Sequence, residues 1–436
     1  MKSKIENEIL NFFINSNDFN GIPLREISKK FNLDYAETIN IVKELVEEDK
    51  ISIQSSTNPH IIGFKHYAKE DQLMLLENAK NDTVEYKQFG KIKIEFESTE
   101  YPVCLYPSPS FLDRYRNLDN FGYAFYSKKL ALGEPQLKPI FFDIEVLERY
   151  YNDPRFEFKF DDYSGSIQCK SDELYNAMVR KEDDIYIKSF GIGYDKDNNR
   201  VAVVFLRFLH NLTAEHQIYW KGKERIDECT ILKEYYQNAI EGSWAFSHSI
   251  FSAFLGELKC LNELSLHIFK INLFNESFED DKKPSEFTFF FVPTLKNYYD
   301  FIHLLDKMIS ENINKSFFKN KIDLFTLKEE DGVHIKENKG TLRLLEEWLS
   351  SIFKVQGEGS VANTIKPFKN IRSERQTPAH KVNENVYDIN LVKKQKDTIS
   401  EVYNSMRQLR NIFSLHPKAK DFEIPDWLEN GKIINL

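Results

Sequence analysis

The chain has 436 residues, a formal net charge of −9 and a pI near 5.7, and its length suffices for roughly two to four domains. Its 41% hydrophobic and 29% charged residues exclude intrinsic disorder, and its overall acidity excludes a polycation that coats nucleic acid. No apolar run reaches the roughly 18 residues that a membrane span requires. Four widely spaced cysteines without a CxxC pair, and an amphipathic N-terminus that contains acids, predict a cytoplasmic protein without disulfides or zinc fingers.

The first 65 residues predict three helices and a β-hairpin. Apolar residues recur at helical spacing in residues 5–13, Pro23 opens a second short helix, and Asp34 caps a third. Residues 50–53 alternate as a strand, which we expect to return through Ile61 and Ile62. This order resembles a winged helix-turn-helix, in which the third helix would enter the major groove of DNA.

The third helix of this segment is acidic. It carries six acids between Asp34 and Asp49, against Lys43 and Lys50, and would therefore repel phosphate. We expect the domain to contact a protein partner or to pack as a cap, with DNA reading as the alternative.

Residues 66–290 predict a central α+β domain rich in β-structure. We expect a connecting helix within 65–87, a strand at 91–96, and a hairpin whose loop is residues 195–199. Two more strand-like runs, 263–274 and 286–293, follow a helix near 243–255. A regulatory protein or a ligand is expected to bind this domain.

Residues 291–436 predict an all-α bundle with a C-terminal tail. Apolar stripes at helical spacing run through 295–318, 341–353 and 390–415, and the run VANTIKPFKNIRSERQ supplies a fourth helix. The expected fold class is therefore α+β, with a winged helix-turn-helix (1–65), a central mixed β-rich domain (66–290) and the bundle (291–436).

The standard catalytic signatures are missing from the sequence. It contains no GxxxxGK[ST], no GxGxxG between a strand and a helix, no HExxH and no GxSxG, and its ten histidines are scattered singly. We therefore expect no cofactor and no metal site.

Residues 372–380, with the sequence RSERQTPAH, carry the remaining candidate. Arg375, four intervening residues and His380 match an R-x(4–6)-H motif, and Gln376 follows the arginine directly. The segment resembles HEPN domains, which are small all-α bundles, many of them metal-independent ribonucleases. The resemblance implies catalytic roles for Arg375, His380 and Gln376, and a homodimer that brings two motifs together. Pro378 departs from the family pattern because it would end the helix early.

Arginine and histidine are residue types that RNA cleavage without a metal requires. A base must take the proton of the 2′-hydroxyl, an acid must protonate the leaving 5′-oxygen, and positive charge must stabilise the pentavalent phosphate. Histidine transfers protons near neutral pH, and the arginine fork binds phosphate.

The segment around the motif is basic. Residues 360–420 contain twelve basic and five acidic residues, a net charge of +7 in a chain whose total is −9. We expect Arg372, Lys369 and Lys381 to bind RNA, while solvated helix faces would explain the lysines equally well.

An alternative reading of the motif is structural. In it, residues 373–380 form an interhelical turn, Arg375 pairs with Glu374 or Glu401, and His380 caps a helix end.

Two further segments, 146–154 (VLERYYNDP) and 212–221 (LTAEHQIYWK), resemble a pattern in uncharacterised bacterial proteins. Glu215 and His216 are residue types that perform acid–base catalysis, but adjacent residues of a helix do not face the same side. Tyr219 and Trp220 are typical core anchors, so we expect structural roles here.

Together these features predict a regulated HEPN-type endoribonuclease, a cytoplasmic hydrolase that acts on RNA. By analogy with the family, it would serve in bacterial antiviral defence or as a toxin. The alternative is a non-enzymatic regulator or scaffold, which binds a partner or DNA through the winged helix and dimerises through the bundle.

Overall fold

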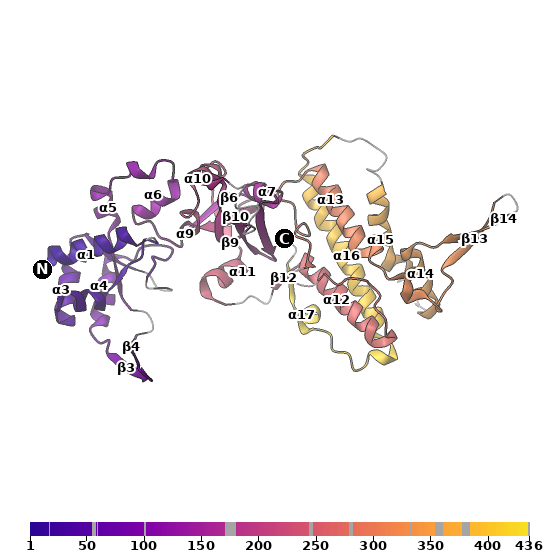
Figure 1. Cartoon of the computed structure of the whole chain (residues 1–436), viewed down its shortest axis with the longest axis horizontal. Helices are drawn as coiled ribbons and strands as arrows, with labels where there is room; N and C mark the ends of the chain where they lie inside the picture. Colours follow the sequence, from indigo (N-terminus) through magenta and orange to yellow (C-terminus); the bar gives the residue numbers. More distant parts are fainter. Residues whose placement is uncertain are drawn as a thin grey trace. The chain divides into compact units, whose positions relative to one another are not determined.

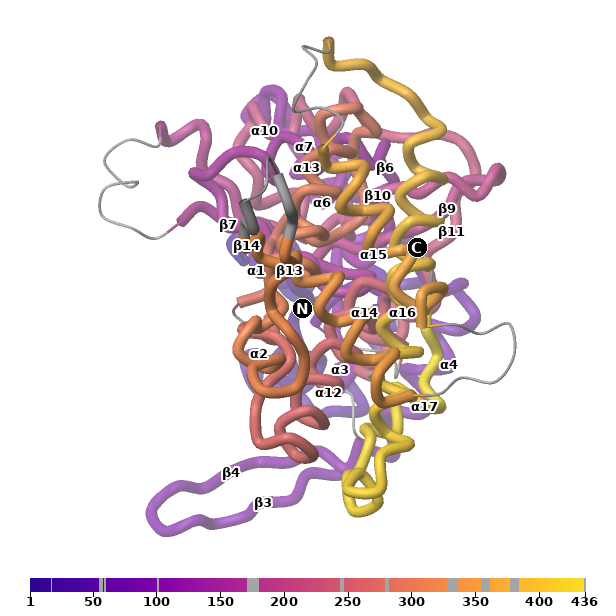
Figure 2. The backbone as a smooth tube through the Cα atoms, turned by 90° about the vertical axis from the view of Figure 1, so that its right-hand side faces the viewer, coloured from indigo at the N-terminus to yellow at the C-terminus, as the bar shows by residue number. Residues whose placement is uncertain are grey.

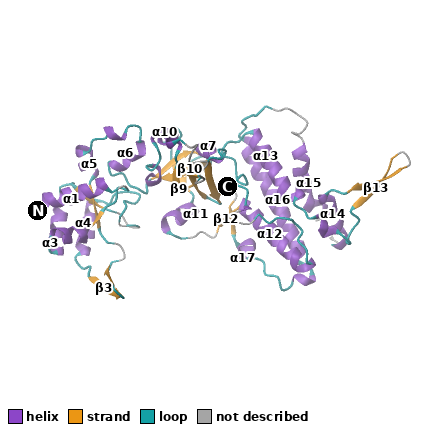
Figure 3. Ribbon diagram, viewed as in Figure 1, coloured by secondary structure: helices purple, strands orange, loops and turns teal. Residues whose placement is uncertain are grey.

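The structure is a computed structural model in which the chain folds into two compact units. The first comprises residues 1–159 and 164–244, and the second residues 160–163 and 245–436. Helices and several β-sheets occur along the chain, which confirms the mixed α+β class (Figure 1 and Figure 3). The structure describes all residues except 17, 55–57, 59, 100–101, 171–179, 244–246, 279–281, 331–332, 354–360, 377–383 and 435–436.

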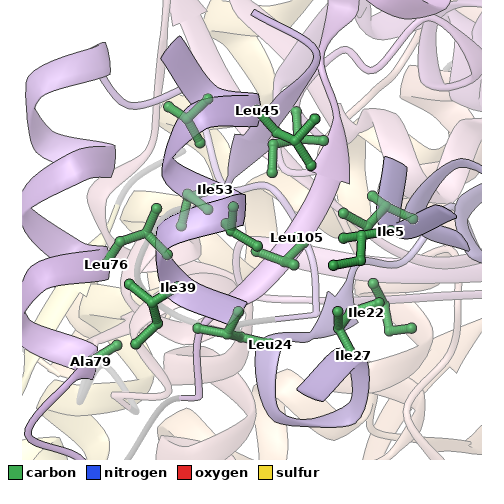
Figure 4. Close-up of a cluster of buried hydrophobic side chains, with 14 residues drawn as sticks. Ile5, Ile22, Leu24, Ile27, Ile39, Leu45, Ile53, Leu76, Ala79 and Leu105 are labelled. Carbon is green, nitrogen blue, oxygen red and sulfur yellow. The ribbon is translucent and has the colours of Figure 1, made fainter. Parts of the chain in front are cut away.

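The N-terminal part of the first unit combines four helices with a three-stranded sheet: α1 (Lys2–Asn15), α2 (Leu24–Phe31), α3 (Tyr35–Glu47), α4 (Lys69–Ala79), β1 (Ile22–Pro23), β2 (Ile51–Ile53) and β5 (Cys104–Pro107). The sheet is antiparallel with the order β1-β5-β2. Asp34 caps α3 as expected, because its carboxylate accepts hydrogen bonds from the backbone N–H groups of Ala36 and Glu37. Aliphatic side chains from all four helices and from the sheet form one core (Figure 4).

The partner of β2 differs from the expected one. Ile53 lies opposite Leu105 of β5, so the predicted return strand through Ile61 and Ile62 is wrong. Both isoleucines are buried, but the carbonyl of Ile62 accepts a hydrogen bond from the backbone N–H of Gln136 at 3.0 Å and is therefore occupied outside the sheet.

A β-hairpin projects from the first unit between α4 and β5. Its strands are β3 (Val84–Phe89) and β4 (Ile92–Glu97), and Gly90 turns the chain with a φ of +61° (Figure 1 and Figure 2). The strand expected at residues 91–96 is thereby confirmed.

The rest of the first unit is built on an antiparallel sheet in the order β6-β10-β9-β8-β7, and β11 pairs with β9. Its strands are β6 (Pro139–Asp143), β7 (Phe156–Asp161), β8 (Ser164–Cys169), β9 (Tyr186–Asp195), β10 (Arg200–Phe205) and β11 (Cys229–Ile231). The predicted hairpin is confirmed as β9 and β10. Asp195 closes its loop by accepting hydrogen bonds from the N–H groups of Asp197 at 2.9 Å and Asn199 at 2.8 Å.

Helices dominate the second unit. They are α12 (Ile250–Phe269), α13 (Leu295–Asp306), α14 (Thr341–Ile352), α15 (Val361–Gln376), α16 (Asn390–Ser414) and α17 (Asp426–Asn430). Helix α12 packs on α16, and α15 packs on α13, α14 and α16 (Figure 1). Two short strand pairs accompany them, β12 (Ser247–Ser249) with β15 (Lys432–Ile434), and β13 (Phe325–Glu330) with β14 (Val333–Asn338).

Two strand predictions in this region are wrong. The first part of the run at 263–274 is the C-terminal end of α12, and no strand is assigned to the described residues 286–293. Leu261, Leu264 and Ile268 lie at helical spacing and are buried, so the 3.6-residue period outweighs the β-propensity of the run. Because α12 belongs to the second unit, that unit begins well before residue 291.

A buried ion pair joins α12 to α16. The side chains of Arg410 and Glu257 are 1% and 0% exposed, and the guanidinium donates to the carboxylate from Nε at 2.6 Å and from Nη2 at 3.0 Å. Nη1 of Arg410 donates to Glu429 of α17. Burial alone would lower the pKa of Arg410, but its hydrogen bonds with Glu257 and Glu429 raise the pKa above the usual value, so the side chain stays charged.

We predict that Glu257→Ala destabilises the second unit by roughly 3–5 kcal/mol, because it leaves the buried guanidinium without its main partner. The matched control is Arg407→Ala on α16, since Arg407 is 39% exposed and lies 3.9 Å from Glu257. That change should cost about 1 kcal/mol or less. Urea unfolding followed by circular dichroism measures both. Equal effects of the two variants would contradict the role assigned to the buried pair.

Candidate functional site at the end of helix α15

Helix α15 places the predicted site residues at its C-terminal end. One face, with Ile365, Phe368 and Ile371, is buried. Lys369, Arg372 and Gln376 are exposed, and Arg375 is half-buried. The predicted site residues His380 and Lys381 lie outside the described residues. The structure therefore brings Arg375, Gln376, Arg372 and Lys369 together on one helix and does not describe the histidine.

Arg375 is held by a carboxylate that is fully buried. Its Nη1 donates to Oδ2 of Asp306, which ends α13, at 2.6 Å, and also to Glu311. Arg372 donates through Nη1 to the same Asp306 oxygen at 3.2 Å and to Oγ of Ser310 at 3.0 Å. Asp306, Ser310, Glu311, Arg372 and Arg375 are called the Asp306 cluster below.

A π-helical turn explains how α13 supplies three members of this cluster. The turn (Lys307–Glu311) follows α13 directly, and Ser310 donates back to the carboxylate of Asp306. Thr341 at the start of α14 donates to the carbonyl of Ser310 at 2.6 Å and fixes the turn. The helix expected across residues 295–318 therefore changes character at Asp306, where the buried charge lies.

The electrostatics of the cluster are those of a closed ion-pair network. The hydrogen bond from Arg375 lowers the pKa of Glu311, and the bonds to Glu311 and Asp306 raise the pKa of Arg375. Two arginines face two carboxylates, so the formal charge of the cluster is zero. Both contacts of Arg375 use Nη1, and among the described residues the structure gives no partner for its Nη2 or Nε.

Other basic side chains of the segment are also neutralised by acids from elsewhere in the second unit. Lys369 lies 2.6 Å from Glu346 of α14, and Arg410 is paired with Glu257 and Glu429. The charge of +7 counted along residues 360–420 is thus reduced in the folded chain, because these partners lie outside that stretch.

Asp306, Ser310 and Glu311 are members of the cluster that the sequence pattern did not predict. One feature of the sequence indicates that Asp306 is buried, because it lies four residues after Ile302 on the apolar stripe of α13. An acid on an apolar stripe requires a buried partner, but nothing in the local pattern identifies Arg372 and Arg375 as that partner. The alternative pairing of Arg375 with Glu374 or Glu401 is not the one in the structure, where Glu374 pairs with Lys394 instead.

The two aromatic segments of the first unit meet in its interior, as structural roles require. The ring Nδ1 of His216 lies 2.8 Å from the hydroxyl of Tyr150, to which Trp220 donates from Nε1 at 3.0 Å. His216 and Trp220 are fully buried, and burial lowers the pKa of His216, so the imidazole is neutral at pH 7. Glu215 is exposed, and the hydrogen bonds of the His216 ring go to Tyr150 and to the carbonyl of Asp183 instead.

Comparison with protein-family models, curated proteins and solved structures gives no match to this chain. In the part of the chain that the structure describes, no three His, Cys, Asp or Glu side chains are grouped as metal ligands would be. None of the described helices combines the length and the apolar character needed to cross a membrane. Function is therefore inferred from the residues and their geometry.

We predict that Arg375→Gln lowers the melting temperature at pH 7 and that its effect shrinks as the pH falls below 4.5. Because Arg375 lowers the pKa of Glu311 below its ordinary value of 4.5, their interaction stabilises the folded chain above that pH. The contribution disappears as the pH falls through the lowered pKa and Glu311 is protonated.

Thermal melting of both proteins across this pH range measures the effect. Lys369→Gln on the same helix is the control, since its exposed pair with Glu346 should contribute about 1 kcal/mol or less. A loss of stability that is the same at every pH would show that Arg375 acts through packing and not through charge.

Proposed function

We propose that the second unit is a HEPN-like bundle that cleaves RNA without a metal ion. The observation that carries the proposal is the placement of Arg375, at the last turn of a packed helix, with its guanidinium anchored by the buried Asp306. A catalytic arginine must be held in one orientation, and a buried carboxylate does this with little freedom. The helix leads directly into the segment that contains His380.

In this proposal, RNA phosphate replaces Glu311 at Arg375. The side chain of Glu311 is 42% exposed, whereas that of Asp306 is 0% exposed, so Glu311 is the partner that can leave. Asp306 then keeps Nη1 in place while Nη2 and Nε bind two phosphate oxygens, as an arginine fork does. Arg372, Lys369 and Gln376 line the same helix and would contact the RNA backbone, together with Lys381.

The reaction is a transesterification in which the RNA supplies the nucleophile. His380 takes the proton of the 2′-hydroxyl, O2′ attacks phosphorus, and the bond to the 5′-oxygen breaks as that oxygen receives a proton. The products are a 2′,3′-cyclic phosphate and a 5′-hydroxyl. A homodimer would supply a second histidine, so that one acts as base and the other as acid.

A non-enzymatic scaffold is the second candidate, and the zero formal charge of the Asp306 cluster favours it. An ion-pair network with no excess positive charge attracts phosphate weakly, and structural ion pairs alone explain its geometry. In that case the bundle would dimerise without chemistry. Cleavage assays decide between the two candidates.

The N-terminal part of the first unit supports a winged helix. We infer this from the order of α1, α2 and α3 and from the sheet order β1-β5-β2, with α4 and the β3–β4 hairpin inserted before the last strand. Glu37, Glu44 and Glu47 are exposed on α3, and Lys43 is paired with Glu77. This surface suits a basic protein partner better than DNA.

We predict that the full-length protein cleaves single-stranded RNA in the presence of EDTA and leaves 2′,3′-cyclic phosphate ends. His380→Ala should lower the rate by about 100-fold or more, because it removes the proton-transfer group. His303→Ala is the matched control, a histidine on α13 outside the motif, and should cleave like the wild type. Unchanged cleavage by the His380→Ala protein would contradict the proposal and favour the scaffold.

We also predict that the full-length protein shows no sequence preference for duplex DNA. Acidic side chains on the exposed face of α3 repel the phosphates on both sides of the major groove. Selection from a random duplex library at low salt should enrich no motif. An enriched motif whose affinity falls in Asn40→Ala, on the exposed face of α3, would show that this helix reads DNA.

A further inference from the structure

The first unit contains a cavity of about 340 Å³ with a charged and aromatic lining. Its wall includes Tyr186 and Lys188 from β9, Arg207 and Phe208 from the short helix α9 (Leu206–Leu209), and His210 directly after it. Asp18, from the turn after α1, also lines the cavity. The volume is within the range of small-molecule sites in proteins.

The buried side chain and backbone of Gln136 form hydrogen bonds with three segments beside this cavity: residues 18–19, Ile62 and Arg207. Gln136 is 2% exposed, and its side-chain Nε2 donates to the carbonyl of Phe19 at 2.6 Å and to that of Asp18 at 3.1 Å. Its backbone carbonyl accepts from the N–H of Arg207 at 2.9 Å, and its own N–H donates to Ile62 at 3.0 Å. Directional hydrogen bonds therefore fix the positions of the segments that surround the cavity.

The cations of the lining are available to a ligand. Among the described residues, the structure gives no ion pair for the side chains of Lys188 or Arg207. Arg225 of the same unit, by contrast, is paired with Asp143, Asp195 and Asp227. The guanidinium of Arg207 lies 6.0 Å from the centroid of the Phe208 ring. The lining thus holds two positive charges, and such groups bind phosphate or carboxylate strongly.

The remaining groups extend the recognition beyond a simple anion. Tyr186 is 51% exposed and Phe208 is half-buried, so their rings can contact a planar group. Asp18 is exposed and can accept hydrogen bonds from sugar hydroxyls. The lining thus contains cations for a phosphate, a carboxylate for a sugar and aromatic rings for a base, which are the three parts of a nucleotide.

We infer that this cavity binds a mononucleotide, with its phosphate at Lys188 and Arg207, its ribose at Asp18, and its base at Tyr186 and Phe208. The site lies wholly in the first unit and is independent of the ribonuclease proposal. It would make the first unit a receptor for a small phosphorylated signal.

Isothermal titration calorimetry on the full-length protein tests this site, with the four nucleoside 5′-monophosphates, adenosine and inorganic phosphate as probes. We expect at least one monophosphate to bind at least tenfold more tightly than adenosine or phosphate alone. Arg207→Ala and Lys188→Ala should each weaken that binding by about tenfold or more, because a charge-assisted hydrogen bond is lost. Lys233→Ala, an exposed lysine of the same unit outside the lining, should leave the affinity unchanged.

Three results would overturn the inference. The first is that none of the four monophosphates binds at millimolar concentration. The second is that inorganic phosphate binds as tightly as the best monophosphate, which would remove the roles of the sugar and the base. The third is that Lys233→Ala weakens binding as much as the two cavity variants, although all three proteins melt at the wild-type temperature.

Discussion

The ion pair between Arg410 and Glu257 spans 153 residues of sequence and lies in the interior of the second unit. Removing two charges from water is costly, and only close, well-oriented hydrogen bonds offset that cost. Helices α12 and α16 can therefore pack only in the register that brings these two side chains together. A shift of one turn would leave the buried guanidinium without its carboxylate.

The same constraint operates again at Asp306, where a buried carboxylate of α13 is shared by two arginines of α15. Here the arginines lie at the edge of the core and are part of the candidate site. A network that orients the helices thus also orients Arg375. Stability and activity must therefore be measured together, since the loss of Arg375 removes a structural partner of Asp306 as well as the proposed phosphate ligand.

In the first unit, neutral polar side chains also connect distant segments through buried hydrogen bonds. Gln136 connects the turn after α1, the segment around Ile62 and helix α9 through backbone carbonyls and N–H groups. Tyr150, His216 and Trp220 form a comparable chain of hydrogen bonds beside the central sheet. The hydrogen bonds that these buried groups make hold distant segments in place with little freedom.

The amino-acid sequence determined the local elements whose patterns depend on near neighbours. The stripes at 341–353 and 390–415 correspond to α14 and α16, the Asp34 cap starts α3, and the alternating runs around residues 195–199 form the β9–β10 hairpin. The α+β class followed from the same patterns.

Only the tertiary structure decided which distant segments meet. Strand β2 pairs with β5 rather than with the nearby isoleucines, and α12 packs on α16, which lies more than a hundred residues further along the chain. The partners of Arg375 likewise lie more than sixty residues away, at Asp306 and Glu311. The physical reason is the distance along the chain. Periodicity and capping involve residues within about four positions of each other. A buried charge or a strand edge, by contrast, pairs with a complementary group that only the folded chain brings close to it.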